Sequence, residues 1–385
     1  AWEPLWADYD PDGPDDQPCL RHLAPAARGF GKRALLVTGR NPRHAARLVA
    51  DLHKAGVGCT PFPTEGEPTL DTVRIGVETA RREGCDLVIA CGGGSAVDAG
   101  KAVAAMLANP GDVLDYLEVI GGGQPLVHAP VPFIAVPTTS GTGSEATRNA
   151  VLHSPQHGVK ASLRSPLMLA KLAVVDPELT LTAPPAVTAA TGLDALAQLL
   201  EPFVSVRANP MTDMFCREGL RRAGRSLQRA FHHGDDLDAR SDMALASLLS
   251  GMALANAGLG AVHGFAAPIG GSFPAPHGAV CAALLAPVTR ANLRALRERA
   301  PGSPALARYD EAARILCGPQ AMADELAVWL DGIRQELEIP RLSAYGIREQ
   351  HIQELCTKAV RASSMKGNPV ALTEEELACV LREAL

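Results

Sequence analysis

Residues 86–98 read Asp86-Leu-Val-Ile-Ala-Cys-Gly-Gly-Gly-Ser-Ala-Val-Asp98, an apolar run followed by three glycines and the start of a helix-like stretch. The run over 86–90 is typical of a buried strand, and residues 95–107 have the pattern of a helix. The glycines permit positive φ and close backbone approach, and the free amides at a helix start can hold a pyrophosphate. Because a plain strand-to-helix turn can have the same glycines, this motif is weak by itself.

Strand-like and helix-like runs alternate on both sides of this stretch. We predict strands at 33–38, 86–90 and 132–136, and helices at 44–55, 69–82 and 95–107. This alternation predicts a parallel sheet with helices on its faces. After about residue 180 the strand signals vanish, and Ala/Leu-rich stretches predict an all-helical domain with segments at 186–200, 210–231, 237–257, 305–336, 347–362 and 373–385.

A chain of 385 residues is long for one core, so two domains are expected. We predict an irregular, acidic and Pro-rich N-terminal arm over residues 1–30, with Trp2 and Trp6 as surface-covering side chains. An α/β domain follows over 31–180, and a helical domain over 181–385.

Charge and cysteine usage limit the class of partner. The net charge of -6 and the absence of a Lys/Arg run argue against nucleic acid, which requires a phosphate-neutralising patch. Nine cysteines without a Cys-x-x-Cys pair favour a reducing cytoplasm. No apolar run approaches the roughly twenty residues that span a bilayer, and no signal segment opens the chain. We expect a cytoplasmic protein that acts on small molecules, without a membrane or nucleic-acid partner.

A second polar loop, Pro137-Thr-Thr-Ser-Gly-Thr-Gly-Ser-Glu145, follows the strand predicted at 132–136. Open α/β sheets bind ligands at the carboxyl ends of their strands. Taken alone, this loop also fits a Ser/Thr-rich turn. Together with the glycine turn at a neighbouring strand end, it predicts a dinucleotide cleft.

Two histidines fourteen positions apart, His263 and His277, follow a helix-like stretch that carries Asp194. Imidazole and carboxylate are common ligands of zinc and ferrous iron, and three of them suffice for a catalytic site with an open position. A lone histidine is more often a hydrogen-bonded interior residue. Gln198 lies four residues after Asp194, on the same helix face, and its amide oxygen is a weaker, uncharged ligand.

Five ordered motifs resemble the iron-containing (group III) alcohol dehydrogenase family: Gly92-Gly-Gly-Ser-x-x-Asp98, Pro137-Thr-Thr-x-Gly-Thr-Gly-Ser-Glu145, Asp176-Pro-Glu-Leu-Thr180, Gly192-x-Asp-Ala-Leu196 and Pro276-His-Gly278. The resemblance runs from about residue 31 to the end of the chain. It implies the dehydroquinate synthase-like fold of this family, with cofactor and metal in a cleft between an α/β domain and a helical domain. It also implies a homodimer.

The resemblance assigns roles to individual residues. It implies that the pyrophosphate region is held by Gly93, Gly94, Ser95 and Asp98, and the adenine and ribose side by Thr138, Thr139 and Thr142. Lys160 would lie close to the cofactor, although a solvated surface lysine is the commoner fate. The implied metal is Fe²⁺, with Zn²⁺ or Mn²⁺ as alternatives, held by Asp194, Gln198, His263 and His277.

Three positions depart from the family pattern. Gly39 stands where NAD-preferring members often carry Asp, and Arg40 follows it. A guanidinium pairs with phosphate, so we favour NADP(H) over NAD(H). Gln198 replaces a usual His, and Ala267 replaces a His that serves in proton transfer. A water chain, a ribose hydroxyl or the cofactor amide could supply the proton instead.

We therefore predict an NAD(P)(H)-dependent alcohol dehydrogenase or aldehyde reductase that acts on a small aldehyde or alcohol. In this hypothesis Asp194, His263 and His277 are catalytic because the divalent ion they hold polarises the substrate carbonyl for hydride transfer. One alternative is a metal-independent keto-acid reductase of the maleylacetate type. Another is a dehydroquinate-synthase-like lyase that recycles its nicotinamide. A non-catalytic binding protein is less favoured because the cofactor loops are intact.

Overall fold

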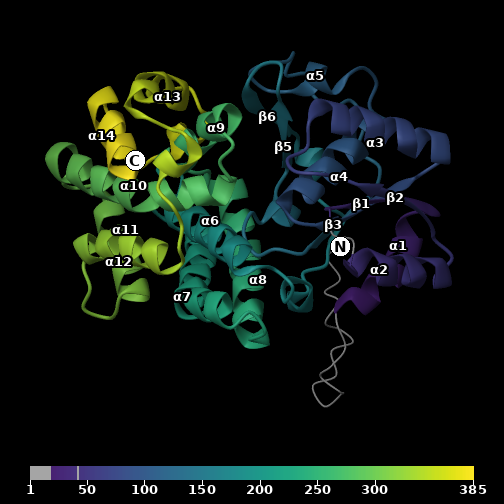
Figure 1. Cartoon of the computed structure of the whole chain (residues 1–385), viewed down its shortest axis with the longest axis horizontal. Coiled ribbons are helices and arrows are strands. Elements are labelled where there is room, and N and C mark those ends of the chain that lie inside the picture. The colour runs from purple at the N-terminus through teal and green to yellow at the C-terminus, as the bar shows by residue number, and fades with distance from the viewer. Residues whose placement is uncertain (1–18, 41–42) are drawn as a thin grey trace.

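The structure, a computed structural model, describes residues 19–40 and 43–385. It has two parts that lie side by side: an α/β half, which contains the strands of the described chain, and a helical half that begins at α6 (Pro185–Val204) (Figure 1). This arrangement confirms the predicted fold class.

The α/β half is built on a five-stranded parallel sheet of order β2-β1-β3-β4-β7. The chain passes from β2 on one side of β1 to β3 on the other, so the strand order reverses between β1 and β3. Ligands of open α/β sheets bind at the carboxyl ends beside such a reversal. The strands are β1 (Arg33–Thr38), β2 (Gly58–Pro63), β3 (Leu87–Gly92), β4 (Phe133–Pro137) and β7 (Leu172–Ala173).

Helices cover both faces of this sheet. Side chains alternate across a strand, so Leu36 and Ile89 face α1 (Leu23–Phe30) and α2 (Arg43–Lys54). Leu35 and Val88 face α3 (Leu70–Glu83) and α4 (Gly94–Ala108) on the opposite side. Burial on both faces explains why these strands are near-continuous apolar runs in the sequence.

Several strands were absent from the sequence prediction. The edge strand β2 contains Pro61 and Pro63, and proline is tolerated at a sheet edge because its missing amide is not needed there. A separate antiparallel pair, β5 (Asn149–Ser154) and β6 (Val159–Arg164), carries polar residues between its buried ones. These strands lack the uninterrupted apolar run that identified the central ones. A short helix, α5 (Val113–Tyr116), lies before β4.

The prediction of an irregular arm through residue 30 is wrong for residues 19–30. They form a 3-10 turn (Cys19–His22) followed by α1, because Leu23, Ala24 and Ala27 share one helix face and pack under the sheet. The predicted surface role of Trp2 and Trp6 lies outside the described residues.

The helical half follows the predicted pattern with one error. The stretch 305–336 is two helices, because Gly318 has a φ of 131° and Pro319 follows it. Two helices, α9 and α10, occupy a segment for which the sequence predicted no bounds. The helices after α6 are α7 (Pro210–His232), α8 (Leu237–Ala257), α9 (Ala261–Ser272), α10 (His277–Arg299), α11 (Pro304–Leu316), α12 (Ala323–Glu336), α13 (Ile352–Val360) and α14 (Glu374–Ala384).

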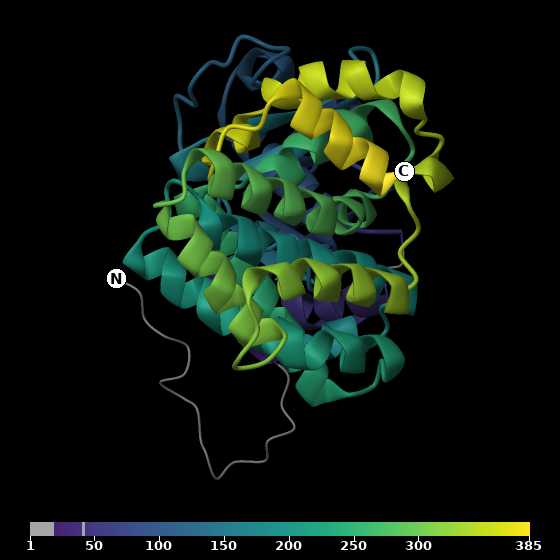
Figure 2. The same cartoon turned by 90° about the vertical axis from the view of Figure 1, so that its left-hand side faces the viewer.

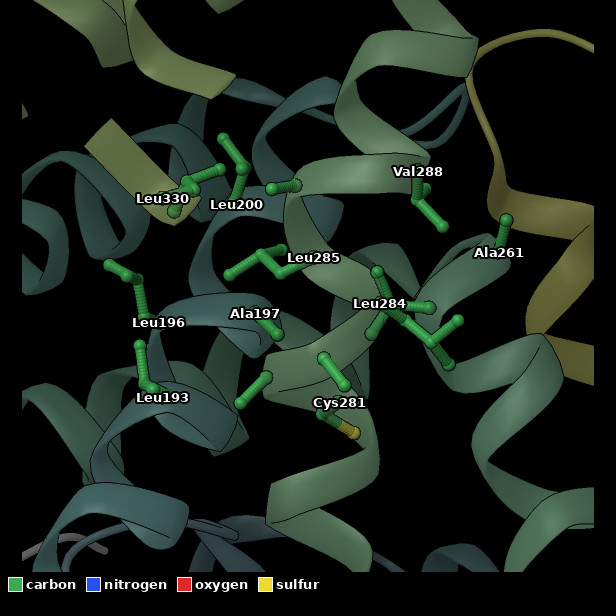
Figure 3. Packing of buried hydrophobic residues seen from close by; sticks show 14 of the residues in the cluster. Leu193, Leu196, Ala197, Leu200, Ala261, Cys281, Leu284, Leu285, Val288 and Leu330 are labelled. Carbon is green, nitrogen blue, oxygen red and sulfur yellow. The ribbon is translucent and has the colours of Figure 1, made fainter. Parts of the chain in front are cut away.

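Helix α10 is the central element of this half. By length and composition it could cross a membrane, and so could α8 and α9 taken together across their 100° bend. However, 83% of the apolar window of α10 is buried inside the protein, as in a core helix. Figure 2 shows the helical half from its outer side, with the α/β half behind it. Figure 3 shows α10 between α6 and the start of α9 at Ala261.

Candidate metal and cofactor site

Asp194 lies in the middle of α6 with its side chain only 2% exposed. Its Oδ2 accepts a hydrogen bond from Gln198 Nε2 at 3.1 Å, one helical turn further on. Among the described residues, its Oδ1 has no hydrogen-bond partner, and neither has Gln198 Oε1. A buried carboxylate oxygen without a partner is costly, so a cation beside it would be stabilising.

His263 comes from the first turn of α9 and is 6% exposed. Its Nε2 lies 3.3 Å from Asp194 Oδ1, while its Nδ1 lies 2.6 Å from Glu201 Oε2. The other oxygen of Glu201 accepts the backbone N–H of Val262 at 2.7 Å. Glu201 therefore fixes both the start of α9 and the orientation of the imidazole, as carboxylates behind metal-bound histidines do.

His277 is the first residue of α10, and its Nε2 lies 3.8 Å from Asp194 Oδ1. The next residue, Gly278, allows this approach because a Cβ there would overlap the carbonyl oxygen of Ala190 on α6. The side chain of His277 is 36% exposed, in contrast to those of Asp194 and His263. The site is therefore open on the side of His277.

Electrostatics favour a charged site. Burial by itself would raise the pKa of Asp194, but His277 and His263 lower it below its ordinary value. Burial would lower the pKa of His263, but Cys281, Glu201 and Asp194 raise it well above its ordinary value. The carboxylate of Asp194 is thus an anion, and the raised pKa values of both histidines favour their protonated forms. A divalent cation bound here would displace those protons.

The sequence analysis missed two residues of this site. Cys281 lies one turn after His277 on α10, and its Sγ is 3.7 Å from Nε2 of each histidine. The ligand atoms of Asp194, His263, His277 and Cys281 all lie within 4.8 Å of one another, so this set fits a divalent metal. The other missed residue is Glu201. Helical spacing could have found both, at four residues from His277 and seven from Asp194.

The two polar loops predicted to bind the cofactor lie against each other. A Cβ on Gly93 would contact Thr139, and one on Gly94 would meet Thr142 at 2.7 Å. The backbone N–H of Thr138 donates to the carbonyl of Gly92 at 3.0 Å. Gly94 is therefore required for this close approach, whereas Gly93 has room for a Cβ. Helix α4 begins here with free backbone amides at Gly94 and Ser95.

Asp98 lies in a polar network that includes Ser144 of the second loop. Its carboxylate accepts hydrogen bonds from the Ser144 hydroxyl and, at 2.9 Å, from the backbone of Val151. Lys101, 1% exposed, lies 3.8 Å from Asp98 and donates to oxygens of Ser144, Thr147 and Asn149. The structure thus shows Asp98 supporting the second loop through Ser144.

Lys160 lies on β6, which packs against α9. Its side chain is 6% exposed and its Nζ is 2.5 Å from Glu67 Oε1. It is therefore a buried, paired lysine and not a solvated surface one.

The position after β1 is also next to the glycine turn. A Cβ on Gly92 would meet the backbone nitrogen of Gly39 at 3.2 Å, so the two strand ends lie side by side. Arg40 is exposed and forms an ion pair with Glu65 at 3.1 Å. The guanidinium of Arg40 therefore lies at this strand end, paired with the carboxylate of Glu65.

Helix α6 connects the loops to the metal-binding group. Thr191 lies against Gly141 of the second loop, and a Cβ on that glycine would overlap it. Asp194 comes three residues later on the same helix. Burial raises the pKa of Asp98 above its ordinary value, and the charge of His277 opposes this rise. The two polar loops and the metal-binding group thus lie close together at the junction of the two halves.

A parallel sheet with a glycine-rich turn, joined to helices that gather a carboxylate and two imidazoles, defines a nicotinamide-dependent oxidoreductase with a metal site. Comparisons with known proteins support this class. A family model described as iron-containing alcohol dehydrogenase matches residues 16–177, and the C-terminal model of the Fe-containing alcohol dehydrogenase family matches 188–385.

Individual relatives match over nearly the whole chain. It is 35% identical over 363 residues to 1,3-propanediol dehydrogenase of Klebsiella pneumoniae, covering 92% of each chain. It is 34% identical over 366 residues to choline dehydrogenase of Bacillus subtilis (strain 168), covering 92% of this chain and 89% of that protein. A solved structure of 1,3-propanediol oxidoreductase superposes with a TM-score of 0.87 at 32% identity, covering 95% and 96%.

The chain belongs to the iron-containing alcohol dehydrogenase family. It is a metal-dependent, NAD(P)-dependent alcohol dehydrogenase with a candidate metal site at Asp194, His263 and His277. The predicted family, fold class and enzyme class are confirmed.

Proposed function

We propose that this enzyme interconverts a small aldehyde and its alcohol at the junction of the two halves, with Asp194, His263 and His277 as the metal-holding catalytic residues. The unpartnered Oδ1 of Asp194, surrounded by two imidazole nitrogens, is the observation that carries the proposal. It supports a cation at a point where the more exposed His277 leaves access for a substrate oxygen.

Each part of the chain has a separate task in this scheme. The bound metal supplies Lewis-acid polarisation of the substrate oxygen, and the nicotinamide supplies the hydride. Glu201 holds the His263 ring so that Nε2 faces Asp194. Gln198 holds the other oxygen of Asp194, and its own free Oε1 keeps it as a candidate ligand.

For the cofactor, we propose that Gly93, Gly94 and Ser95 hold the pyrophosphate at the start of α4, where the helix dipole favours a negative charge. Thr138, Thr139 and Thr142 line the adenine and ribose side, and Asp98 supports them through Ser144. Lys160 lies near the cofactor on the side of α9. Because the side chain of Ala267 has no titratable group, another donor must supply the proton. The candidates are a water chain, a ribose hydroxyl and the cofactor amide.

We further propose a preference for NADP(H). Gly39 places no carboxylate at the end of β1, and Arg40 can exchange its exposed partner Glu65 for a 2'-phosphate. We propose Fe²⁺ as the metal, with Zn²⁺ and Mn²⁺ as alternatives, a homodimer as the assembly, and the cytoplasm as the location. The free cysteines of the described chain fit that reducing compartment.

One experiment tests the whole scheme. Purified protein is analysed for metal, stripped with a chelator, reloaded with Fe²⁺, Zn²⁺ or Mn²⁺, and assayed against a panel of small aldehydes with NADPH and NADH by nicotinamide absorbance. We expect activity to vanish on stripping and to return on reloading, with NADPH the better donor. Unchanged activity after stripping would identify the metal-independent keto-acid reductase instead. Turnover without net consumption of NADPH would identify the lyase.

A variant provides the residue-level test. Asp194→Ala removes the unpartnered carboxylate oxygen, and we expect it to abolish metal-dependent turnover with every ion. Retained turnover at the wild-type rate would contradict the proposed metal site.

A further inference from the structure

Cys281 is the member of the four-residue group to which neither the motifs nor the comparisons assign a role. It is a free, fully buried thiol on α10, the helix that packs on both α6 and α9 (Figure 3). It follows His277 by four residues, so both side chains project from one face of that helix. A buried cysteine is by itself an ordinary small apolar side chain, so a metal-binding role has to be inferred from the atoms around it.

The surroundings of Cys281 have the dimensions of a tetrahedral site. Ligand atoms that sit about 2.0–2.3 Å from one ion in tetrahedral directions lie about 3.3–3.8 Å apart. Cys281 Sγ lies 3.7 Å from Nε2 of His263 and 3.7 Å from Nε2 of His277. Asp194 Oδ1 lies 3.3 Å and 3.8 Å from the same two nitrogens. Four of the six separations among these atoms, which come from three helices, thus match tetrahedral edges, and the ligand atoms of the group all lie within 4.8 Å of one another.

An independent observation points into the same space. Asp194 Oδ1 is buried and has no hydrogen-bond donor, although both imidazoles approach it. A cation that satisfies this oxygen would lie beside the two imidazole nitrogens, which both approach Cys281 Sγ to 3.7 Å.

Gln198 is the competing fourth ligand, and its geometry is less suitable. Its Nε2 donates to Asp194 Oδ2, and reversing the amide would place its oxygen against that carboxylate oxygen. The amide is thus held as a support for Asp194. An amide oxygen is also a weaker ligand than a thiolate for zinc and similar ions.

We propose that Cys281 is the fourth protein ligand of the metal, so that the site is Asp194, His263, His277 and Cys281, with Gln198 as a positioning residue. This inference rests on the proposed function and assigns the ligand that replaces the missing imidazole at position 198. With four protein ligands, the ion would need a further coordination position to polarise a substrate oxygen, which zinc sites can provide. Among the proposed ions, a thiolate ligand favours zinc over manganese, because soft sulfur suits zinc whereas manganese prefers oxygen ligands.

The test uses the full chain, stripped and then loaded with one equivalent of Co²⁺ or Zn²⁺. We expect a thiolate-to-cobalt charge-transfer band in the near ultraviolet, and a zinc-edge X-ray absorption shell of sulfur at about 2.3 Å. Both signals should be absent from Cys281→Ala, and the metal dissociation constant should rise at least about tenfold. Cys281→Ser, which keeps the volume, should also lose both signals, and a circular dichroism spectrum like that of the wild type shows that the loss does not come from unfolding.

Two controls separate this inference from the proposed function. Cys216→Ala removes another fully buried thiol of the helical half and should keep both sulfur signals. Gln198→Ala should also keep them, with weaker binding. If the wild-type protein bound cobalt without a charge-transfer band, and Asp194→Ala did not bind it, the role of Cys281 would be overturned. The proposed metal site would then remain intact. Binding that is insensitive to Asp194→Ala would overturn both.

Discussion

Glu201 Oε2 lies 2.6 Å from His263 Nδ1, and both side chains are 6% exposed. Because Glu201 and Asp194 are on the same helix, α6 presents one carboxylate to each nitrogen of this imidazole. The ring is thereby fixed without any contribution from solvent.

Glu201→Gln should weaken the metal site while leaving its ligands in place. A neutral amide orients the imidazole less strongly and lowers its basicity, and such changes typically cost 10- to 100-fold in metal affinity. Competition with a chromophoric chelator measures the dissociation constant. Circular dichroism of the metal-free protein checks that the fold is retained, and an unchanged dissociation constant would contradict the orienting role.

Gly278→Ala should disturb both stability and metal binding. The added Cβ would overlap the carbonyl oxygen of Ala190, so α10 must move away from α6 and carry His277 away from Asp194. Overpacking of this kind costs about 1–3 kcal/mol. Urea unfolding and metal titration measure the two effects.

The matched control is Gly332→Ala in α12, where a Cβ meets nothing within 4 Å. This change should raise the free energy of unfolding by about 0.5–1 kcal/mol and leave metal affinity unchanged. If Gly278→Ala behaved in the same way, the close contact of α10 with α6 would not be what brings His277 into the site.

Gly39→Asp should shift the coenzyme preference toward NADH. The new carboxylate would lie at the end of β1, where it repels a 2'-phosphate and can bind a ribose hydroxyl. We expect the ratio of kcat/KM for NADPH to that for NADH to fall at least about tenfold, or about 1.4 kcal/mol. Gly39→Ala adds bulk without charge in open space and should leave the ratio unchanged. Equal ratios in both variants would refute the proposed NADP(H) preference.

Asp242 should contribute stability that is lost in acid. It joins α8 to α7 through hydrogen bonds from Arg225, Ser226 and Arg222. The Arg225 guanidinium, despite opposing burial, lowers the pKa of Asp242 to about 2. A carboxyl group whose pKa is lower in the folded than in the unfolded state, where it is about 3.9, stabilises fully above the unfolded value. That stability disappears as the pH falls through about 2.

Asp242→Asn should therefore lower the free energy of unfolding of the metal-free protein by about 1–2 kcal/mol at pH 7, a value reduced because Arg225 is largely exposed. The difference from wild type should shrink between about pH 4 and pH 2. Urea unfolding across this range measures it. Asp238→Asn, an exposed carboxylate on the same helix, should show little change, and a pH-independent difference for Asp242→Asn would contradict the ion-pair origin.

Local sequence patterns were sufficient to predict an α/β half followed by a helical half. Apolar runs such as 86–90 and the glycine turn after them predicted the central strands, because a strand buried on both faces must be apolar throughout. Edge strands such as β2 were missed because they lack an uninterrupted apolar run. The break at Gly318 was missed because it lies within a helix-like stretch.

The amino-acid sequence by itself determined the family, the two kinds of domain, and Asp194, His263 and His277 as candidate ligands, since motif order and residue chemistry are local properties. The tertiary structure alone placed the sulfur of Cys281 between the two imidazoles, placed Glu201 behind His263, and turned Asp98 toward Ser144. Such contacts depend on how α6, α9 and α10 pack in space. Distances between side chains on different helices are fixed by that packing and have no local signature in the sequence.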